Sequence, residues 1–361
     1  MSTSPDDGAA YAGRVSALIE DLELQLLRAI AAELRAGSDA TWEQTALAGL
    51  QRWRQAAARG VAGAEQGLLQ VILEVMLAAR DDGVTSAAAD LNEAGISRGR
   101  PRPAGATVRQ AEQLAAQVMA TLQQTPRLLT SVYQQAVTAG AGEVLGGKVT
   151  RLQAAQHVLD RLLVRGITGF RDSSGRNWAL TSYVEMAVRT ATGHAAIDGH
   201  TQTLEAAGMD LVVVSDSPRE CPGCRPWEGK VLSLSGRVGT TLVPSATGLQ
   251  AVRVEVAGSL SRARSAGLFH PNCTHRLTGL IPGVSRPRPV ADPAGYAAKQ
   301  RQRDLERHVR EWKRREAVAL DDGAAARARA KTREWQRALR EHVDANGLKR
   351  LRRREQIGVA T

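Results

Sequence analysis

Five residues whose side chains bind transition metals are grouped in one part of this chain. Cys221 and Cys224 form a C-x2-C pair, and after 45 intervening residues His270, Cys273 and His275 form an H-x2-C-x-H pattern. They include all three cysteines of the protein and two of its seven histidines. A C-x2-C turn before a short strand, joined by a second ligand pair from a distant loop, is typical of a tetrahedral zinc site.

We expect a structural Zn²⁺ ion held by Cys221, Cys224, His270 and Cys273, with His275 behind these ligands or as an alternative ligand. Such an ion would tie a long polar segment to the rest of the protein where little apolar area is available. The alternative is a set of buried, reduced cysteines in a small β-region. Three cysteines in this pattern favour a metal or a reducing compartment over a secreted disulfide scaffold.

The same residues fit two enzymatic interpretations poorly. A zinc deaminase needs an H-x-E pattern before the C-x2-C, and this pattern is missing here. A Cys/His hydrolase could use Cys273 or Cys224 with His270, but no element that would stabilise an oxyanion can be identified. We therefore assign no catalytic residue and expect the protein not to be an enzyme.

Most of the chain that must position this block is predicted to be helical. Aromatic residues make up only 3% of the chain, which suits helices packed through Ala and Leu. Apolar residues at helical spacing predict helices over 15–34, 41–53, 62–79, a short one after 85, one from 107, one from 125, one over 149–165 and a long one over 178–207. Gly208 is expected to be the C-cap of the long helix. Glu185 and Arg189, four residues apart on that helix, are expected to form an ion pair.

Strands are predicted around the candidate metal ligands, at 209–215, 230–234 and 251–256, with a β-hairpin between the two halves of the site. Beyond 289, Trp312 and Trp335 each lie in the apolar stripe of a helix, which predicts a hairpin with its arginines outward. The predicted fold class is mainly α with a small α+β central domain. It comprises a helical N-terminal half, a β-containing segment clasped by the Cys/His cluster, and a C-terminal helical hairpin.

The predicted organisation has six parts. They are an N-terminal helical region (1–94), a linker (95–106), a second helical region (107–168), a central α+β domain with the Cys/His cluster (169–282), a linker (283–292) and a basic helical tail (293–361). The N-terminus lacks the pattern of a signal peptide and no run approaches about 18 apolar residues, so we expect no membrane span and a cytoplasmic location where the protein is made.

The positive charge is concentrated in the tail. Residues 284–361 contain 21 Lys+Arg and 11 Asp+Glu, a net charge of +10, whereas the whole chain carries +11. This asymmetry favours a polyanion near the tail, and the alternative is a solvated helical face. The residues expected near nucleic acid are Lys313, Arg314, Arg315, Lys349, Arg350, Arg352, Arg353 and Arg354.

The sequence from Asp172 to Pro282 resembles the phage minor capsid (minor head) proteins, the group of phage minor capsid protein 2 and the Mu F-like head morphogenesis proteins. The resemblance is carried by 175–178, 183–190, 216–224, 227–233 and 267–275, and weakly by the tail. The residues of these motifs to which we assign a structural role are Arg176, Trp178, Glu185, Arg189, Thr190, Trp227, Gly229, Lys230, Pro271 and Asn272.

The resemblance implies a structural protein of the virion, present in few copies near the portal inside the head, which helps head assembly and DNA packaging or delivery. Its expected partners are the portal protein, capsid or scaffold proteins and packaged double-stranded DNA. The zinc site is predicted from this chain's own ligands, because many relatives lack the first cysteine pair. The alternatives left open are a Cys/His hydrolase or protease of head maturation and a zinc-dependent nucleic-acid-binding protein.

Overall fold

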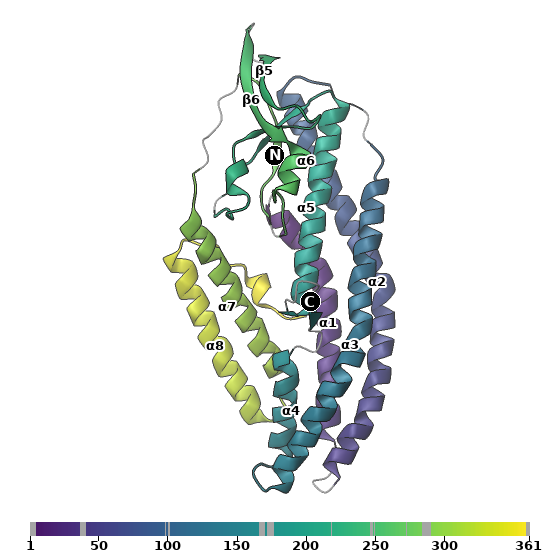
Figure 1. Cartoon of the computed structure of the whole chain (residues 1–361). Coiled ribbons are helices and arrows are strands. Elements are labelled where there is room, and N and C mark those ends of the chain that lie inside the picture. Colours follow the sequence, from purple (N-terminus) through teal and green to yellow (C-terminus); the bar gives the residue numbers. More distant parts are fainter. Residues whose placement is uncertain are drawn as a thin grey trace. The chain divides into compact units, whose positions relative to one another are not determined.

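The structure, a computed structural model, consists of two compact units. It describes residues 5–36, 41–97, 99, 102–165, 170–171, 177–217, 219–245, 248, 250–271, 273–283 and 290–358. Unit 1 comprises Met1–Arg14, Gln70–Leu114 and Glu185–Ala297, and unit 2 comprises Val15–Leu69, Ala115–Val184 and Ala298–Thr361. Figure 1 labels the α-helices of both units and the strands β5 and β6. The six-part organisation expected from the sequence stays a prediction.

Eight α-helices account for most of the described residues. They are α1 (Pro5–Arg35), α2 (Trp42–Glu93), α3 (Gly105–Leu145), α4 (Arg151–Arg165), α5 (Leu180–Ala206), α6 (Leu260–Ser265), α7 (Pro293–Val318) and α8 (Asp322–Ala345), with short 3₁₀ turns η1 (Arg225–Trp227) and η2 (Arg352–Glu355). The mainly α class with a small β-containing centre is confirmed. Gly208, with a φ of +79°, ends α5 as predicted, and Met209 N donates back to Leu204 O at 2.9 Å.

Two predicted sets of helix boundaries are wrong. The helices expected over 41–53, 62–79 and after 85 form the single helix α2, which continues through Gly60, Gly63 and Gly67. Likewise α3 passes Pro126, where a new helix was expected. Glycine costs a helix only about 1 kcal/mol per residue, and buried apolar residues on both sides of each interruption outweigh local propensity.

Unit 1 is built around a five-stranded sheet in the order β5-β6-β4-β3-β7. The strands are β3 (Leu211–Val214), β4 (Val231–Ser233), β5 (Gly239–Pro244), β6 (Ala251–Ser259) and β7 (Leu277–Gly279). All neighbours are antiparallel except β4 and β6. The predicted strands and the β5–β6 hairpin are confirmed, whereas β7 and α6 were not predicted because each is short.

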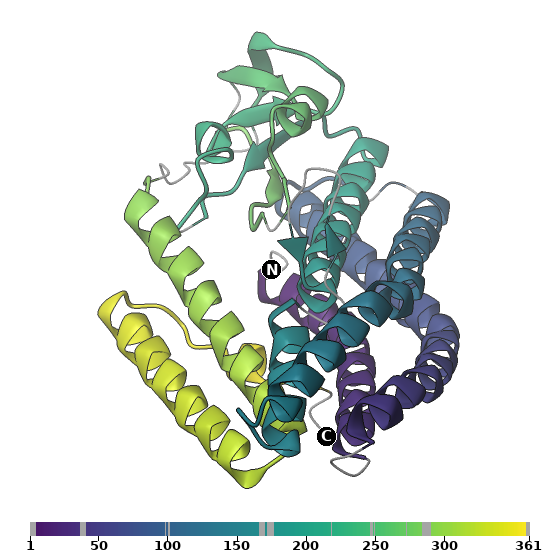
Figure 2. The ribbon, with the colours of Figure 1, turned by 60° about the horizontal axis from the view of Figure 1, so that its bottom comes forward.

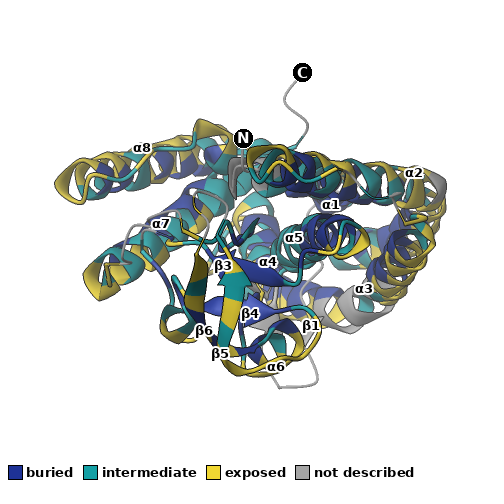
Figure 3. Cartoon of the chain, turned by 90° about the horizontal axis from the view of Figure 1, so that it is seen from above, coloured by how far each residue is buried: buried dark blue, intermediate teal, exposed yellow. Residues whose placement is uncertain are grey.

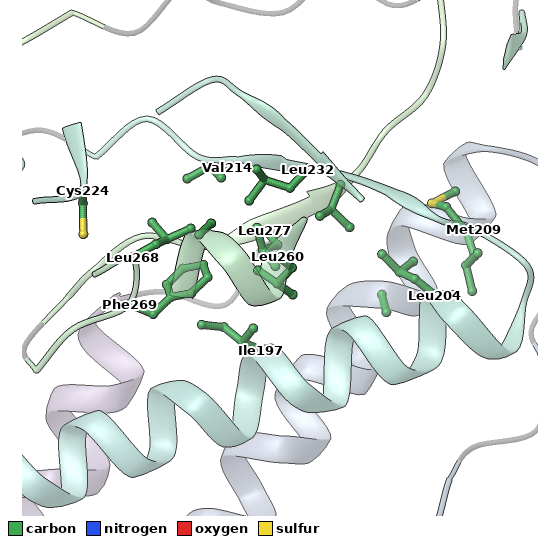
Figure 4. Close-up of a cluster of buried hydrophobic side chains, with 14 residues drawn as sticks. Ile197, Leu204, Met209, Val214, Cys224, Leu232, Leu260, Leu268, Phe269 and Leu277 are labelled. Carbon is green, nitrogen blue, oxygen red and sulfur yellow. The ribbon is translucent and has the colours of Figure 1, made fainter. Parts of the chain in front are cut away.

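The sheet of unit 1 buries apolar residues on both faces. Val212, Val214 and Leu232 face a cluster that includes Ile197 and Leu204 of α5, whereas Leu211, Val213, Val231, Val254 and Val256 form the opposite cluster. Figure 4 shows the first cluster between the strands and α5. Successive side chains of a strand point to opposite faces of the sheet. Both faces of β3 are buried, which explains why all four of its residues are apolar. This packing holds the loops that carry the cysteines against α5.

The helices of unit 1 approach closely at two glycines. A Cβ at Gly83 of α2 would lie 1.9 Å from the carbonyl oxygen of Ala196, and one at Gly199 of α5 would lie 2.3 Å from that of Arg80. Asp90 of α2 also contacts His200 Nε2 at 2.9 Å and accepts a hydrogen bond from Gly279 N of β7 at 2.6 Å. These contacts fix the sheet on the α2–α5 pair.

Unit 2 has a helical core in which aromatic side chains bond to neighbouring backbones. Trp42 Nε1 donates to Leu34 O at 3.0 Å and Trp53 Nε1 donates to Leu26 O at 3.1 Å, so the α1–α2 pair is tied twice. Tyr133 of α3 donates to Ala46 O at 3.0 Å. Unit 2 also contains the two-stranded pair β1 (Phe170–Arg171) and β2 (Asn177–Trp178).

The C-terminal helices α7 and α8 pack as the predicted hairpin, which Figure 2 shows from another side. Leu305 of α7 packs with Leu339 and Val343 of α8. The His308 ring stacks on Trp335 with 4.2 Å between the ring centroids. The predicted hairpin and the apolar stripe around Trp335 are therefore confirmed, whereas Trp312 is not part of this buried cluster.

Among the described helices, α2 is the one long and apolar enough to cross a membrane by length and composition, contrary to the expectation that no such run exists. Core helices of soluble proteins pass the same test. In unit 2 this helix buries Trp42, Ala46, Leu50 and Trp53 within the protein.

Candidate metal centre

The structure brings all five candidate metal ligands of unit 1 together. Cys221, Cys224 and His270 have ligand atoms within 4.8 Å of one another, and so do Cys224, Cys273 and His275. Cys221 Sγ lies 2.7 Å from His270 Nε2, and Cys224 Sγ lies 3.5 Å from Cys273 Sγ. Cys224 therefore belongs to both groups and lies at the centre of the cluster.

The first cysteine pair lies on a tight turn between β3 and β4. Cys224 N donates to Cys221 O at 3.2 Å and Arg225 N donates to the same oxygen at 3.1 Å. Cys224 N also lies 3.4 Å from Cys221 Sγ, so a backbone donor faces the sulfur. Glu220, just before the turn, forms an ion pair with Arg225, just after it, at 2.5 Å. This ion pair connects the two ends of the turn. The turn therefore presents both sulfurs on one side.

The second group lies on the loop between α6 and β7, which has unusual backbone geometry. Phe269 has a φ of +62°, a conformation that is uncommon for a residue with a side chain. Its carbonyl oxygen lies 2.9 Å from His194 Nε2 of α5, which holds the loop in place. Cys273 N donates to His270 O at 2.9 Å, and His275 N lies 3.4 Å from Cys273 Sγ.

His275 is held from behind by a buried carboxylate. Its Nε2 lies 2.6 Å from Glu228 Oε1, and both side chains are 2% exposed. Its Nδ1 lies 3.3 Å from Cys273 Sγ and so faces the sulfurs. Glu228 also accepts a hydrogen bond from Ser217 N at 3.1 Å. An imidazole with one nitrogen on a carboxylate and the other toward thiol groups has the arrangement of a metal-binding histidine.

The sulfur distances fit a metal site better than a disulfide. All three cysteines are free thiols, and 3.5 Å between Cys224 and Cys273 is far longer than a disulfide bond of about 2.05 Å. Ligand atoms about 2.3 Å from a tetrahedral zinc ion would be about 3.8 Å apart. The residues present therefore fit a tetrahedral thiolate and imidazole site, with five donors for four positions.

The cluster distributes charge unevenly among its thiols and imidazoles. The hydrogen bond with Cys273 and burial raise the pKa of Cys224, whereas the same hydrogen bond lowers the pKa of Cys273. Burial raises the pKa of Cys221. Burial opposes protonation of His275, but its contacts with Cys224 and Glu228 raise its pKa overall. The contacts within the cluster therefore shift the pKa of Cys273 and that of His275 in opposite directions, each toward the charged form.

Comparison with known proteins decides the family. The family model of phage minor capsid protein 2 matches residues 5–344. The chain belongs to this family. No curated protein and no solved structure gave a match. The family identifies the chain as a minor capsid protein of a phage head. The matched range extends the resemblance from the central 172–282 to the N-terminal helices.

Several residues of the minor capsid motifs have clear structural roles in unit 1. Arg189 Nη2 lies 2.6 Å from Glu185 Oε1, which confirms the predicted ion pair. Thr190 donates its hydroxyl to Met186 O at 2.8 Å within α5. Gly229, with a φ of +67°, makes the turn between Glu228 and β4.

The remaining motif residues are less informative. Trp227 packs against the buried cluster that includes Cys224, whereas Lys230 and Pro271 are exposed. Arg176 and Asn272 lie outside the described residues, and only the backbone of Trp178 is described.

The minor capsid sequence motif contains Glu228, but sequence reasoning gave it no role. The signal available was its place four residues after Cys224, between Trp227 and Gly229. A single acidic residue in a turn is usually solvated, so burial of its carboxylate could not be foreseen. The contact with His275 spans 47 positions of the sequence.

The residues expected near nucleic acid divide into two groups. Arg315 pairs with Glu311 at 2.5 Å and lies over the Trp312 ring, Arg350 pairs with Glu355 at 2.6 Å, and Arg354 lies 3.7 Å from Glu306. Lys313 Nζ donates to Gln356 at 2.8 Å. By contrast, Lys349, Arg352 and Arg353 are exposed and Arg314 is half-buried.

Proposed function

We propose that this minor capsid protein is a structural component at or near the portal inside the phage head, where it helps head assembly and DNA packaging or delivery. The observation that carries the proposal is the family match over 5–344, which spans residues of both units. The concentration of positive charge in the tail supports a place next to packaged DNA. Its partners would be the portal protein and capsid or scaffold proteins, after synthesis in the host cytoplasm.

The Cys/His cluster would act as a structural clasp by holding Zn²⁺. Zinc bound there would crosslink the turn after β3 to the loop before β7 and so supply folding energy to a sheet with short strands. Three cysteines and one histidine would make a complete tetrahedral set. We take His275 as the histidine ligand because it is buried and contacts Glu228, whereas His270 is half-exposed and lies beside Cys221 and Cys224.

A Cys/His hydrolase of head maturation is the second candidate, and one contact favours it. Cys221 Sγ and His270 Nε2 are 2.7 Å apart, within reach for proton transfer. A nucleophilic cysteine needs a lowered pKa, and burial raises the pKa of Cys221. The hydrogen bond between Cys224 and Cys273, the two nucleophiles expected from the sequence, raises the pKa of Cys224 and lowers that of Cys273. Cys221→Ser would abolish a processing activity if this candidate were correct, and should leave head-protein processing unchanged under the structural proposal.

Location in the virion tests the structural role directly. Purified heads should contain the protein in a few copies, and chemical crosslinking should join it to the portal protein. Heads that lack the protein, or crosslinks confined to the outer coat surface, would overturn the proposal.

A further inference from the structure

We propose that one face of α8, formed by four arginines, is the surface through which this protein binds duplex DNA. The residues of this arginine face are Arg329, Arg333, Arg337 and Arg340. The inference rests on the proposed place of the tail next to packaged DNA. It assigns the contact to a surface that the sequence-based selection of basic residues does not include.

Two basic residues of the C-terminal cluster, Arg350 and Arg354, are committed to internal ion pairs in unit 2, whereas Lys349, Arg352 and Arg353 are exposed. Arg350 binds both carboxylate oxygens of Glu355 at 2.6 Å, and the two side chains are 22% and 2% exposed. Arg310 donates to the carbonyl oxygen of Arg354, whose guanidinium lies near the buried Glu306. Gln302 donates to Lys349 O at 3.0 Å. These contacts hold residues 349–356 on α7, so binding phosphate through Arg350 or Arg354 would require breaking buried ion pairs.

In contrast to Arg350 and Arg354, the arginines of the arginine face are exposed. Its members are spaced by four, four and three residues, which places them on one side of a helix with 3.6 residues per turn. All four are exposed, and the side chains of Arg329 and Arg337 are 50% and 67% exposed. The other side of α8 packs on α7 through Leu339 and Val343. Figure 3 shows the long exposed surface of α8.

The acidic groups nearest the arginine face form only long contacts with it, and Asp344 lies four residues after Arg340 on the same side of α8. Arg329 lies 3.8 Å from Glu316 and Arg337 lies 4.0 Å from Glu341, and exposed ion pairs of this length contribute little. Across the described part of the chain, Arg333 and Arg340 form no ion pair within 4.0 Å. All four guanidinium groups can therefore bind phosphate without breaking an internal ion pair that contributes much to stability.

The dimensions of the face match a DNA backbone. With a rise of about 1.5 Å per residue, Arg329 and Arg340 are about 16 Å apart along α8. One DNA strand presents a phosphate about every 3.4 Å along the duplex axis, so about five phosphates span the same length. Guanidinium groups bind phosphate oxygens through two parallel hydrogen bonds. Backbone contacts of this kind carry no sequence information, which suits a protein next to packaged DNA of any sequence.

The test uses the full-length protein and a duplex of about 30 bp, with affinity measured by fluorescence anisotropy as KCl is varied. A variant with all four arginines changed to Gln should bind about 100-fold more weakly at about 0.1 M salt, and its plot of log affinity against log salt should lose about 3 in slope. A four-arginine-to-Lys variant should keep most of the slope. A matched control removes the same charge from exposed positions elsewhere, with Arg54→Gln, Arg59→Gln, Arg109→Gln and Arg262→Gln.

The outcomes separate this inference from the proposed function. If the wild-type protein binds with a steep salt slope and the Gln variant keeps that slope, the arginine face is wrong but DNA contact elsewhere stands. Failure of the wild-type protein to bind DNA at about 50 mM salt overturns both. Binding of polyglutamate but not DNA would assign the face to an acidic protein and also overturn the proposal. If the matched control loses as much of the slope of log affinity against log salt as the Gln variant does, DNA binding depends on net charge alone. That result would overturn the assignment of DNA binding to α8.

Discussion

His275 and Glu228 form a buried pair in which Nε2 and Oε1 are 2.6 Å apart and both side chains are 2% exposed. The pair connects the two halves of the Cys/His cluster, because Glu228 follows the first cysteine turn and His275 belongs to the second loop. A carboxylate on one imidazole nitrogen orients the other nitrogen toward a metal. The His275–Glu228 pair therefore supports the Cys/His cluster, and a substitution can remove this support without changing a cysteine.

Removing the charge of Glu228 should weaken zinc binding. Glu228→Gln keeps the shape of the side chain but loses the carboxylate that orients His275, so zinc affinity should fall about 10- to 100-fold. Competition with a chromophoric chelator measures this. The exposed Glu255→Gln on β6 is the control and should bind zinc as the wild type does. Equal affinities for the wild type and Glu228→Gln would contradict the role of the pair.

The two histidines should differ as zinc ligands. His275→Ala should lower the zinc content of protein purified without chelator to well below one equivalent, because it removes the buried donor. His270→Ala should keep about one equivalent, since His270 is half-exposed and a fifth donor is available. Elemental analysis of both variants decides the point. If His270→Ala loses zinc and His275→Ala keeps it, the ligands are those expected from the sequence: Cys221, Cys224, His270 and Cys273.

The core beneath the cluster should be sensitive to truncation. Leu232 in β4 is completely buried, and Leu232→Ala should lower the free energy of unfolding by about 2–5 kcal/mol. Leu242 in β5 is 67% exposed, and Leu242→Ala should change it by less than about 0.5 kcal/mol. Urea unfolding followed by circular dichroism compares them. Similar midpoints for the two variants would mean that the sheet does not carry the stability of unit 1.

The buried Glu306 and the half-buried Glu20 of unit 2 should make its stability depend on pH. Burial raises the pKa of Glu20 and Glu306, although Arg310 opposes the shift in both cases. The folded state then binds more protons than the unfolded state between the two pKa values, so this contribution is present at low pH and is lost as the pH rises through the folded pKa. Glu306→Gln should reduce the loss of stability that occurs as the pH rises above the ordinary glutamate pKa of 4.5.

Urea unfolding at several pH values measures this contribution. The exposed Glu334→Gln serves as the control and should retain the wild-type dependence on pH. An identical pH dependence for the wild type and Glu306→Gln would show that burial of this carboxyl group has no energetic consequence.

Regular features of this fold could be predicted from local sequence, and contacts between distant segments could not. The C-x2-C spacing indicated the cluster, and the stripe around Trp335 indicated the α7–α8 hairpin. The continuity of α2 through Gly60 depends on tertiary packing, which outweighs the low helix propensity of glycine.

The ion-pair partners of individual charged side chains could not be predicted from the local sequence either. Glu228 and His275 are 47 positions apart, and the pairing of Arg354 with Glu306 depends on how residues 349–356 fold back on α7. Two arginines of the basic run, Arg350 and Arg354, therefore have internal ion pairs that the sequence did not indicate, and phosphate binding by the exposed members of the run stays a prediction. The exposed arginines of α8 are spread over three turns, so they form a cluster only when the helix is considered in three dimensions.

The most direct test of the central claim is the location and copy number of this protein in purified phage heads. Quantitative mass spectrometry of heads, combined with crosslinking to the portal protein, provides both. The account predicts a few copies per head and crosslinks between this chain and the portal. Absence from assembled heads, with the protein recovered only as a free cytoplasmic species, would contradict it.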